Sequence, residues 1–188
     1  MIRLIGHALL AFVLSAGLAR ADGEYLQFDL GPTDSTAVGS FERDGISTGA
    51  VWSRYTDGGS LGFSTSLSRQ LSLGGRPVTL RYGPSLRYDG DVRLGAKIVA
   101  ENYTSTDWGG VFVIGEINSI DWSYFSMIEA SRNPAGQSLA LVATGDDTGY
   151  AEQSLVVAKT ISGSDWRIRA GYRLQAREVF VGAALNTF

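Results

Sequence analysis

Residues 61–73 read Leu-Gly-Phe-Ser-Thr-Ser-Leu-Ser-Arg-Gln-Leu-Ser-Leu, and nearly every second residue is apolar. Leucine and phenylalanine occupy most of the odd-numbered positions, with Arg69 as the interruption, while glycine, serine and glutamine occupy the even ones. A β-strand points successive side chains to opposite faces. The stretch therefore predicts a sheet with one apolar face and one polar face.

The same alternation recurs in residues 80–88, 92–101 and 166–175, and short clusters of Gly, Asp, Asn and Pro separate such segments along the whole chain. These residues favour turns, and no segment has a sustained helical period. Pro84 cannot donate to a ladder, so a bulge or local break is expected there. The predicted strands are 24–30, 36–43, 46–56, 60–73, 78–88, 92–103, 110–118, 121–131, 137–145, 150–161, 166–175 and 178–188.

The first residues have the pattern of a secretory signal peptide. Arg3 supplies the positive start, residues 4–18 form a mostly apolar run, and Ala19-Arg20-Ala21 is a small-x-small cleavage site. The alternative is a membrane anchor, but the run is shorter than the roughly 20 residues that a spanning helix needs. We therefore expect residues 1–21 to be removed and residues 22–188 to form one β-barrel domain.

Composition argues against several classes of function. Without residues 1–21 the chain keeps 14 basic and 19 acidic residues, with neither histidine nor cysteine. The acidic balance disfavours a nucleic-acid partner. Serine–histidine and cysteine–histidine catalysis and histidine metal sites are excluded, so we expect no enzyme, cofactor or metal. A carboxylate-dependent hydrolase using Glu101, Glu116 or Glu129 stays as a second alternative.

Two architectures share the alternating pattern. A soluble periplasmic barrel or sandwich would turn its apolar faces inward around an apolar ligand, whereas an outer-membrane barrel turns them toward lipid. Segments of this length match the roughly 9 to 11 residues with which a tilted strand crosses a bilayer. Aromatic residues near strand ends are expected to form interfacial girdles. These residues are Tyr55, Tyr88, Tyr103, Trp108, Trp122 and Trp166.

We predict an all-β fold, namely a single antiparallel up-and-down transmembrane β-barrel. An open sheet edge is too costly in lipid, so the barrel must close, and a single bacterial chain then has an even number of strands. Twelve strands fit the turns best, with ten or eight as alternatives.

Residues 177–188 form a strand-like segment that ends in Phe188. This end resembles the terminal strand of Gram-negative outer-membrane β-barrels, whose pattern has a final aromatic residue and apolar residues at alternate positions before it. Phe180, Gly182, Ala184 and Phe188 fit that alternation, whereas Asn186 does not. The other face is more apolar, so the register stays open. The resemblance implies the outer membrane as location, its lipid and the barrel-assembly machinery as partners, and Phe180 and Phe188 as an assembly signal.

In such a barrel the polar face lines the interior. The expected lumen residues are Arg81, Arg87, Arg93, Lys97, Glu101, Glu116, Glu129, Arg167, Arg169 and Arg173. One interpretation is an aqueous passage that favours anions, because charged linings set selectivity. The other is an ion-pair network that fills the barrel. We predict a structural or porin-like role with passive passage of small, anionic solutes. The acidic turn 146–149 is expected to be an ordinary solvated turn rather than a calcium site.

Overall fold

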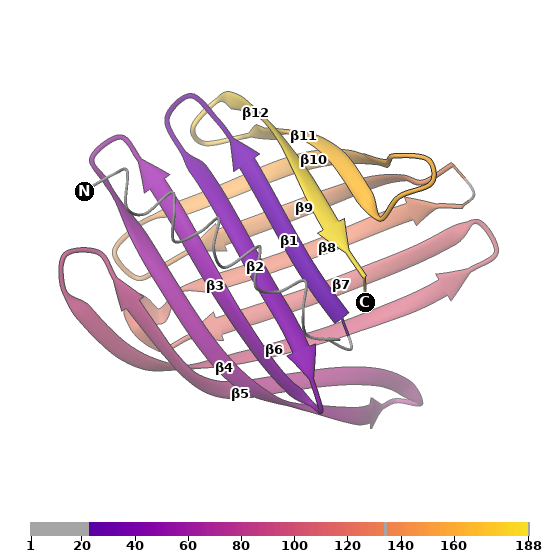
Figure 1. The fold of residues 1–188 in the computed structure, drawn as a ribbon, viewed down its shortest axis with the longest axis horizontal. Helices are drawn as coiled ribbons and strands as arrows, with labels where there is room; N and C mark the ends of the chain where they lie inside the picture. Colours follow the sequence, from indigo (N-terminus) through magenta and orange to yellow (C-terminus); the bar gives the residue numbers. More distant parts are fainter. Residues whose placement is uncertain (1–22, 134, 188) are drawn as a thin grey trace.

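The chain forms a closed barrel of twelve antiparallel strands in up-and-down order (Figure 1). The structure, a computed structural model, describes residues 23–133 and 135–187; the predicted signal peptide, residues 1–21, and Phe188 lie outside this part. No helix within the described ranges is long and apolar enough to span a membrane. The strands are β1 (Gly23–Leu30), β2 (Ser35–Arg43), β3 (Ile46–Tyr55), β4 (Gly58–Leu73), β5 (Arg76–Tyr88), β6 (Val92–Thr106), β7 (Gly109–Asn118), β8 (Tyr124–Arg132), β9 (Gln137–Gly145), β10 (Ala151–Thr160), β11 (Trp166–Arg173) and β12 (Glu178–Asn186).

The predicted all-β, up-and-down barrel of twelve strands is confirmed, and the alternatives of ten or eight strands are wrong. β1 closes the sheet by pairing antiparallel with β12, and Tyr25 stands opposite Asn186. The start of β1 and the end of β12 therefore lie at one end of the barrel, which we call the terminal end. The hairpins β1–β2, β3–β4, β5–β6, β7–β8, β9–β10 and β11–β12 turn at the other end, the distal end.

Tight turns fix the pairing of consecutive strands. Asp44 and Gly45 connect β2 to β3 with φ of 52° and 73°, and Gly74 and Gly75 connect β4 to β5 with φ of 59° and 78°. Two central residues with positive φ give the turn whose twist matches that of the flanking strands. These turns lock the register that the alternation of side chains requires.

The structure corrects one predicted strand. Residues 121–131 were expected to be extended, but β8 begins only at Tyr124. Before it, the 3-10 turn η1 (Ile120–Trp122) places Asp121 and Trp122 at φ of 55° and 43°. These left-handed conformations interrupt the strand and turn the buried Ile120 toward the barrel.

The apolar face points outward. Leu67 is 42% exposed, Leu94 79% and Ile168 56%, and Leu86 pairs with Leu94 on the same face. Serines and charged residues alternate with them on the inner face, for example at Ser66, which is buried. The alternative in which the leucine-rich faces line an internal apolar cavity is therefore wrong.

Pro84 produces the expected local break. The ladder between β4 and β5 pairs Ser64 with Ser85 and resumes at Leu67 with Tyr82, in unchanged register. The break is therefore not a bulge, since no extra residue is inserted. At this point the Cβ atom of any side chain on residue 83 would overlap with the Thr65 carbonyl oxygen, so only glycine fits.

The aromatic residues follow the expected girdles only in part. Tyr88 and Trp166 lie on the outer face, at the distal end of β5 and the terminal end of β11. Trp108 and Trp122 lie in turns at the terminal and distal ends. Tyr55 and Tyr103 instead share the alternation of the inner-face residues Ser53 and Glu101, so the girdle prediction is wrong for these two.

Candidate functional site: the barrel interior

The ten predicted lumen residues all lie on the inner alternation of their strands, and each forms at least one ion pair. These residues are Arg81, Arg87, Arg93, Lys97, Glu101, Glu116, Glu129, Arg167, Arg169 and Arg173. Six carboxylates that the sequence analysis did not single out complete the pairs: Asp29, Asp34, Glu42, Asp89, Asp121 and Glu178. The interior thus carries the ion-pair network that was one of the two interpretations.

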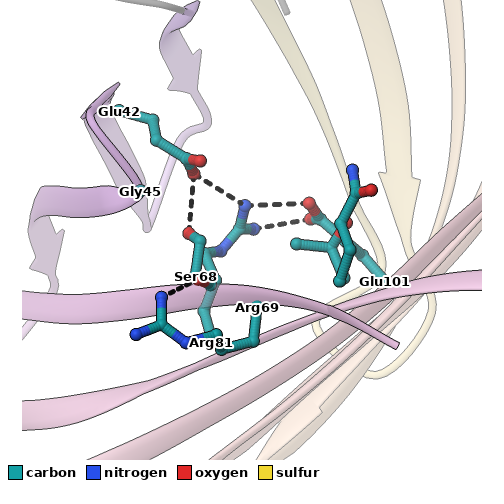
Figure 2. A pocket seen from close by; sticks show the side chains of 8 residues that line it. Glu42, Gly45, Ser68, Arg69, Arg81 and Glu101 are labelled. Atoms are coloured by element: carbon teal, nitrogen blue, oxygen red, sulfur yellow. Dashed lines mark hydrogen bonds and ion pairs between the residues drawn. The ribbon is translucent and has the colours of Figure 1, made fainter.

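At the terminal end, a pocket of about 320 Å³ opens beside Arg81 (Figure 2). The Arg81 guanidinium binds Glu101 of the neighbouring strand through two hydrogen bonds of 2.8 and 2.5 Å. One of the two donors, Nη1, also faces Glu42 of β2 at 3.9 Å, and the hydroxyl of Ser68 donates to that carboxylate at 2.9 Å. We call the pocket with Glu42, Ser68, Arg81 and Glu101 the Arg81 mouth.

In the Arg81 mouth, Arg81 binds the carboxylate of Glu101 more strongly than that of Glu42. A bidentate arginine–carboxylate pair is the strongest common ion-pair geometry, whereas 3.9 Å is at the limit of direct contact. Arg81 is therefore anchored on Glu101, and its contact with Glu42 is the weaker of the two. A solute group could compete with Glu42 for Nη1 while Nη2 keeps its hydrogen bond to Glu101.

Two further pairs lie along the inner wall rather than across the centre. Arg169 of β11 reaches Asp29 of β1 at 2.9 Å, passing β12 where Gly182 leaves room, because a side chain there would collide with Asp29. Lys97 and Glu116 pair at 3.1 Å between the adjacent strands β6 and β7. Because Gly182 has no side chain, the Arg169 and Asp29 side chains can lie along the inner wall above β12.

The distal end carries two clusters. Arg87 and Arg93 share Asp89 and Asp121, with 3.3 Å from Arg87 and 2.5 Å from Arg93 to Asp121. This shared carboxylate pair ties η1 to β5 and β6. Ile120, next to it, is buried and would meet any side chain placed on Gly95, so η1 narrows this end of the barrel.

The second distal cluster surrounds Arg173, which is buried. Its guanidinium pairs with Glu178 and with Asp34, the latter at 3.8 Å, and lies 5.0 Å from the centre of the Phe180 ring. Glu152 accepts hydrogen bonds from the backbone amides of residues 175 and 176 at 2.9 Å each and so holds the β11–β12 turn. This cluster joins the three distal hairpins β1–β2, β9–β10 and β11–β12.

Burial shifts two pKa values in the distal turns. It raises the pKa of Asp34 above 3.8, although Arg173 acts in the opposite direction. Burial, followed by the negative charges of Asp34 and Glu152, also raises the pKa of Tyr150 to about 12. Both groups therefore hold their protons more tightly in the folded barrel than in an unfolded chain.

One side of the interior is lined by small polar residues, and we call it the serine–glycine wall. Its members on β2, β3 and β4 are Ser40, Ser47, Gly49, Ser53, Ser60, Gly62, Ser64 and Ser66. Val51 lies within this wall, beside Val38 and Gly62, and is still 38% exposed. The space in front of Val51 is therefore open to solvent, whereas Ser66 of the same wall is buried.

The opposite side of the interior is packed. Phe180, Ala140 and Val156 form a buried cluster, with Met127 and Val142 against it. This decides the register that the sequence left open, because Phe180 points inward while Val179 and Val181 are exposed on the outer face. The alternation that contains Phe180 is thus the inner one.

The acidic turn 146–149 is satisfied by its own chain. Asp146 Oδ1 accepts hydrogen bonds from the Thr148 amide at 2.9 Å and the Thr148 hydroxyl at 2.6 Å. Within the ranges 23–133 and 135–187, no group of three or more potential ligands could hold a metal ion. The three glutamates considered for hydrolysis are each paired with a different base, namely Glu101 with Arg81, Glu116 with Lys97 and Glu129 with Arg167.

Comparison with known proteins places the fold. No protein-family model and no curated protein matches the chain. Among solved structures the barrel is similar to a KdgM porin in complex with disordered oligogalacturonate, with a TM-score of 0.55 and 11% identity, over 87% of this chain and 98% of that one. The barrel therefore has a porin fold.

Proposed function

We propose that this chain is a small outer-membrane barrel with a porin-like role, which allows passive passage of small solutes, anionic ones included. The observation that carries the proposal is the division of the barrel into an apolar outer wall and a polar, charged interior. Charged side chains in hydrocarbon are costly, so this arrangement suits a barrel with lipid outside and water inside. The similarity to a porin that binds an acidic oligosaccharide supports the same assignment.

The passage would run in front of the serine–glycine wall. The ion pairs of Arg169 with Asp29 and of Arg167 with Glu129 connect strands on the other side of the barrel and lie along its wall. At the terminal end the route passes the Arg81 mouth. At the distal end it passes the paired residues Arg87 and Arg93 under η1.

Anion passage would depend on arginines that exchange partners. Every arginine in the interior network has a carboxylate partner, so the lining is not a ring of bare positive charge. The carboxylate of a solute can take the place of Glu42 at Nη1 of Arg81, while the hydrogen bond from Nη2 to Glu101 keeps the guanidinium in position. A solute held in this way is bound weakly enough to leave again, and conduction requires such weak binding.

Reconstitution in planar bilayers tests the proposal. We expect discrete channel events, with a reversal potential in a salt gradient that shifts toward cation preference in Arg81→Gln. Arg76→Gln is the matched control, because Arg76 is exposed on the outer face of the same strand. Absence of channel events from barrels that are folded and inserted would contradict the porin-like role.

A structural role without conduction is the second candidate. The packed cluster around Phe180 and the ion pairs favour it, because they fill one side of the interior. A barrel that resists extraction by carbonate but never conducts would support it. Release into the soluble periplasmic fraction would contradict both membrane proposals.

The barrel-assembly machinery and outer-membrane lipid are the partners proposed with this role. In β12 the lipid-facing residues are Val179, Val181, Ala183 and Leu185, which pair with outward residues of β11. Phe188 follows this strand in the sequence. Removing Phe188 should lower the fraction of protein that reaches the heat-modifiable, folded form in cells and leave refolding in detergent unchanged.

A further inference from the structure

The outer wall carries a hollow across β8 to β12, near the terminal end. This groove has a volume of about 1000 Å³, and Trp108 is among the residues that line it. The register places five outward residues side by side along it: Ala130, Leu139, Val157, Ala170 and Val181. Two of them are alanines, and these small side chains between larger ones create the hollow.

A polar row borders this apolar row on the side of the terminal end. Arg132 pairs with Gln137, Gln137 pairs with Lys159, and Lys159 pairs with Ile168 in the register. Arg132, Gln137 and Lys159 are exposed on the outer face. Two positive charges and an amide thus lie one step along the barrel axis from an apolar groove.

We propose that this groove binds an anionic glycerophospholipid, with its phosphate on Arg132, Gln137 and Lys159 and an acyl chain along the row of Leu139 and Val157. The site rests on the proposed membrane insertion of the barrel. We assign the site to a lipid because the basic edge lies toward the terminal end and the apolar floor toward the middle of the wall. A phospholipid of the leaflet at the terminal end presents its own charge and chain in that order.

The basic edge gives the preference for an anionic lipid, whereas the groove gives the position. An acyl chain gains little hydrophobic energy by leaving other lipids, since the bilayer is already apolar, and it gains mainly van der Waals contact in a hollow that fits it. Each basic side chain near a membrane surface adds attraction for anionic headgroups. Loss of one charge should weaken retention about fivefold, given the usual contribution per residue.

Native mass spectrometry of the barrel, refolded in detergent micelles with phosphatidylglycerol or phosphatidylcholine, tests the site. We expect the unmodified barrel to keep one phosphatidylglycerol after partial delipidation, and Arg132→Gln/Lys159→Gln to lose it. The double variant Arg69→Gln/Arg76→Gln removes two other exposed arginines of the barrel and should keep it. Ala170→Phe, which fills the groove without changing charge, should also lose it, whereas Ala100→Phe, on the outer face of β6, should not.

Equal retention in all variants, or equal retention of the two lipids, would overturn the site. These measurements are made in detergent and do not depend on conduction. A barrel that keeps phosphatidylglycerol and never conducts would contradict the porin-like role and leave the lipid site supported. A barrel that conducts and shows no difference among the variants would overturn the lipid site alone.

Discussion

Arg167 of β11 contacts Glu129 of β8 at 2.9 Å, although two whole strands, β9 and β10, lie between them. The guanidinium also donates to the hydroxyl of Ser138 on β9, so the side chain lies along the inner wall. The two side chains are about one fifth exposed, at 22% and 19%. Through these contacts Arg167 connects β11 to β8 and β9.

Replacing Glu129 with glutamine should therefore destabilise the barrel and leave the proposed passage open. We expect a loss of about 2 kcal/mol, between the values for exposed and buried ion pairs, because Arg167 loses its carboxylate. Urea unfolding in lipid vesicles measures the loss. In the double variant Glu129→Gln/Arg167→Gln, stability should partly recover, and no recovery would show that the pair does not act as a unit.

Phe180→Ala should lower the stability of the barrel and widen its lumen. The ring packs against Ala140 and Val156 inside the barrel, so its removal leaves a cavity and costs about 3 kcal/mol. Single-channel conductance should rise, since the new space adjoins the lumen. Val179→Ala, on the outer face of the same strand, is the control and should change neither quantity appreciably. Unchanged conductance in Phe180→Ala would show that the packed cluster does not limit the passage.

Gly83→Ala should impair folding. The new methyl group would collide with the Thr65 carbonyl oxygen of the neighbouring strand, and overpacking of this kind costs about 3 kcal/mol or more. Gly115→Ala is the matched control, because its methyl group meets open space. The folded fraction on gels run with and without boiling measures the difference. Equal folded fractions would mean that β4 and β5 can move apart at Pro84.

Asp34 should make the barrel less stable as pH rises. Its pKa is raised by burial, so between pH 3.8 and its folded-state pKa the folded chain holds a proton that the unfolded chain has lost. Stability therefore falls as pH rises through this window. Asp34→Asn should remove that part of the pH dependence in urea unfolding measured at several pH values. A variant with the same dependence as the unmodified barrel would assign the effect to another carboxylate.

The strands could be predicted because each carries its own signal. Alternation and turn residues are local, and they identified twelve strands and the outward direction of Leu67 and Ile168. The prediction was wrong at residues 121–123, where Asp121 and Trp122 adopt positive φ, since no local pattern distinguishes this turn from the start of a strand. Tyr55 and Tyr103 were assigned to the girdles because they lie near strand ends. Their odd or even place in the alternation, which puts them on the inner face, was not considered.

The partners of the lumen residues could be predicted only in part. The alternation placed Arg81 and Glu101 on the polar face, and these two do meet. Nothing in the sequence indicates that Glu42 would lie within reach of Arg81. Their distance depends on the curvature of the sheet from β2 to β5, which are three strands apart. Glu42 does stand on the polar alternation of its strand, and parity applied to every charged residue would have included it.

The pairing of β1 with β12 means that the described barrel has a seam that only the full set of strands can close. All other neighbouring strands in the sheet are consecutive in sequence and can pair as hairpins while the chain folds. The β1–β12 ladder can form only when both the first and the last strand are present. In the proposed membrane setting, a shortened chain would present two unpaired strand edges to hydrocarbon, where each unsatisfied peptide group costs several kcal/mol. Loss of an outermost strand should thus abolish the inserted state altogether, instead of yielding a slightly smaller version of it.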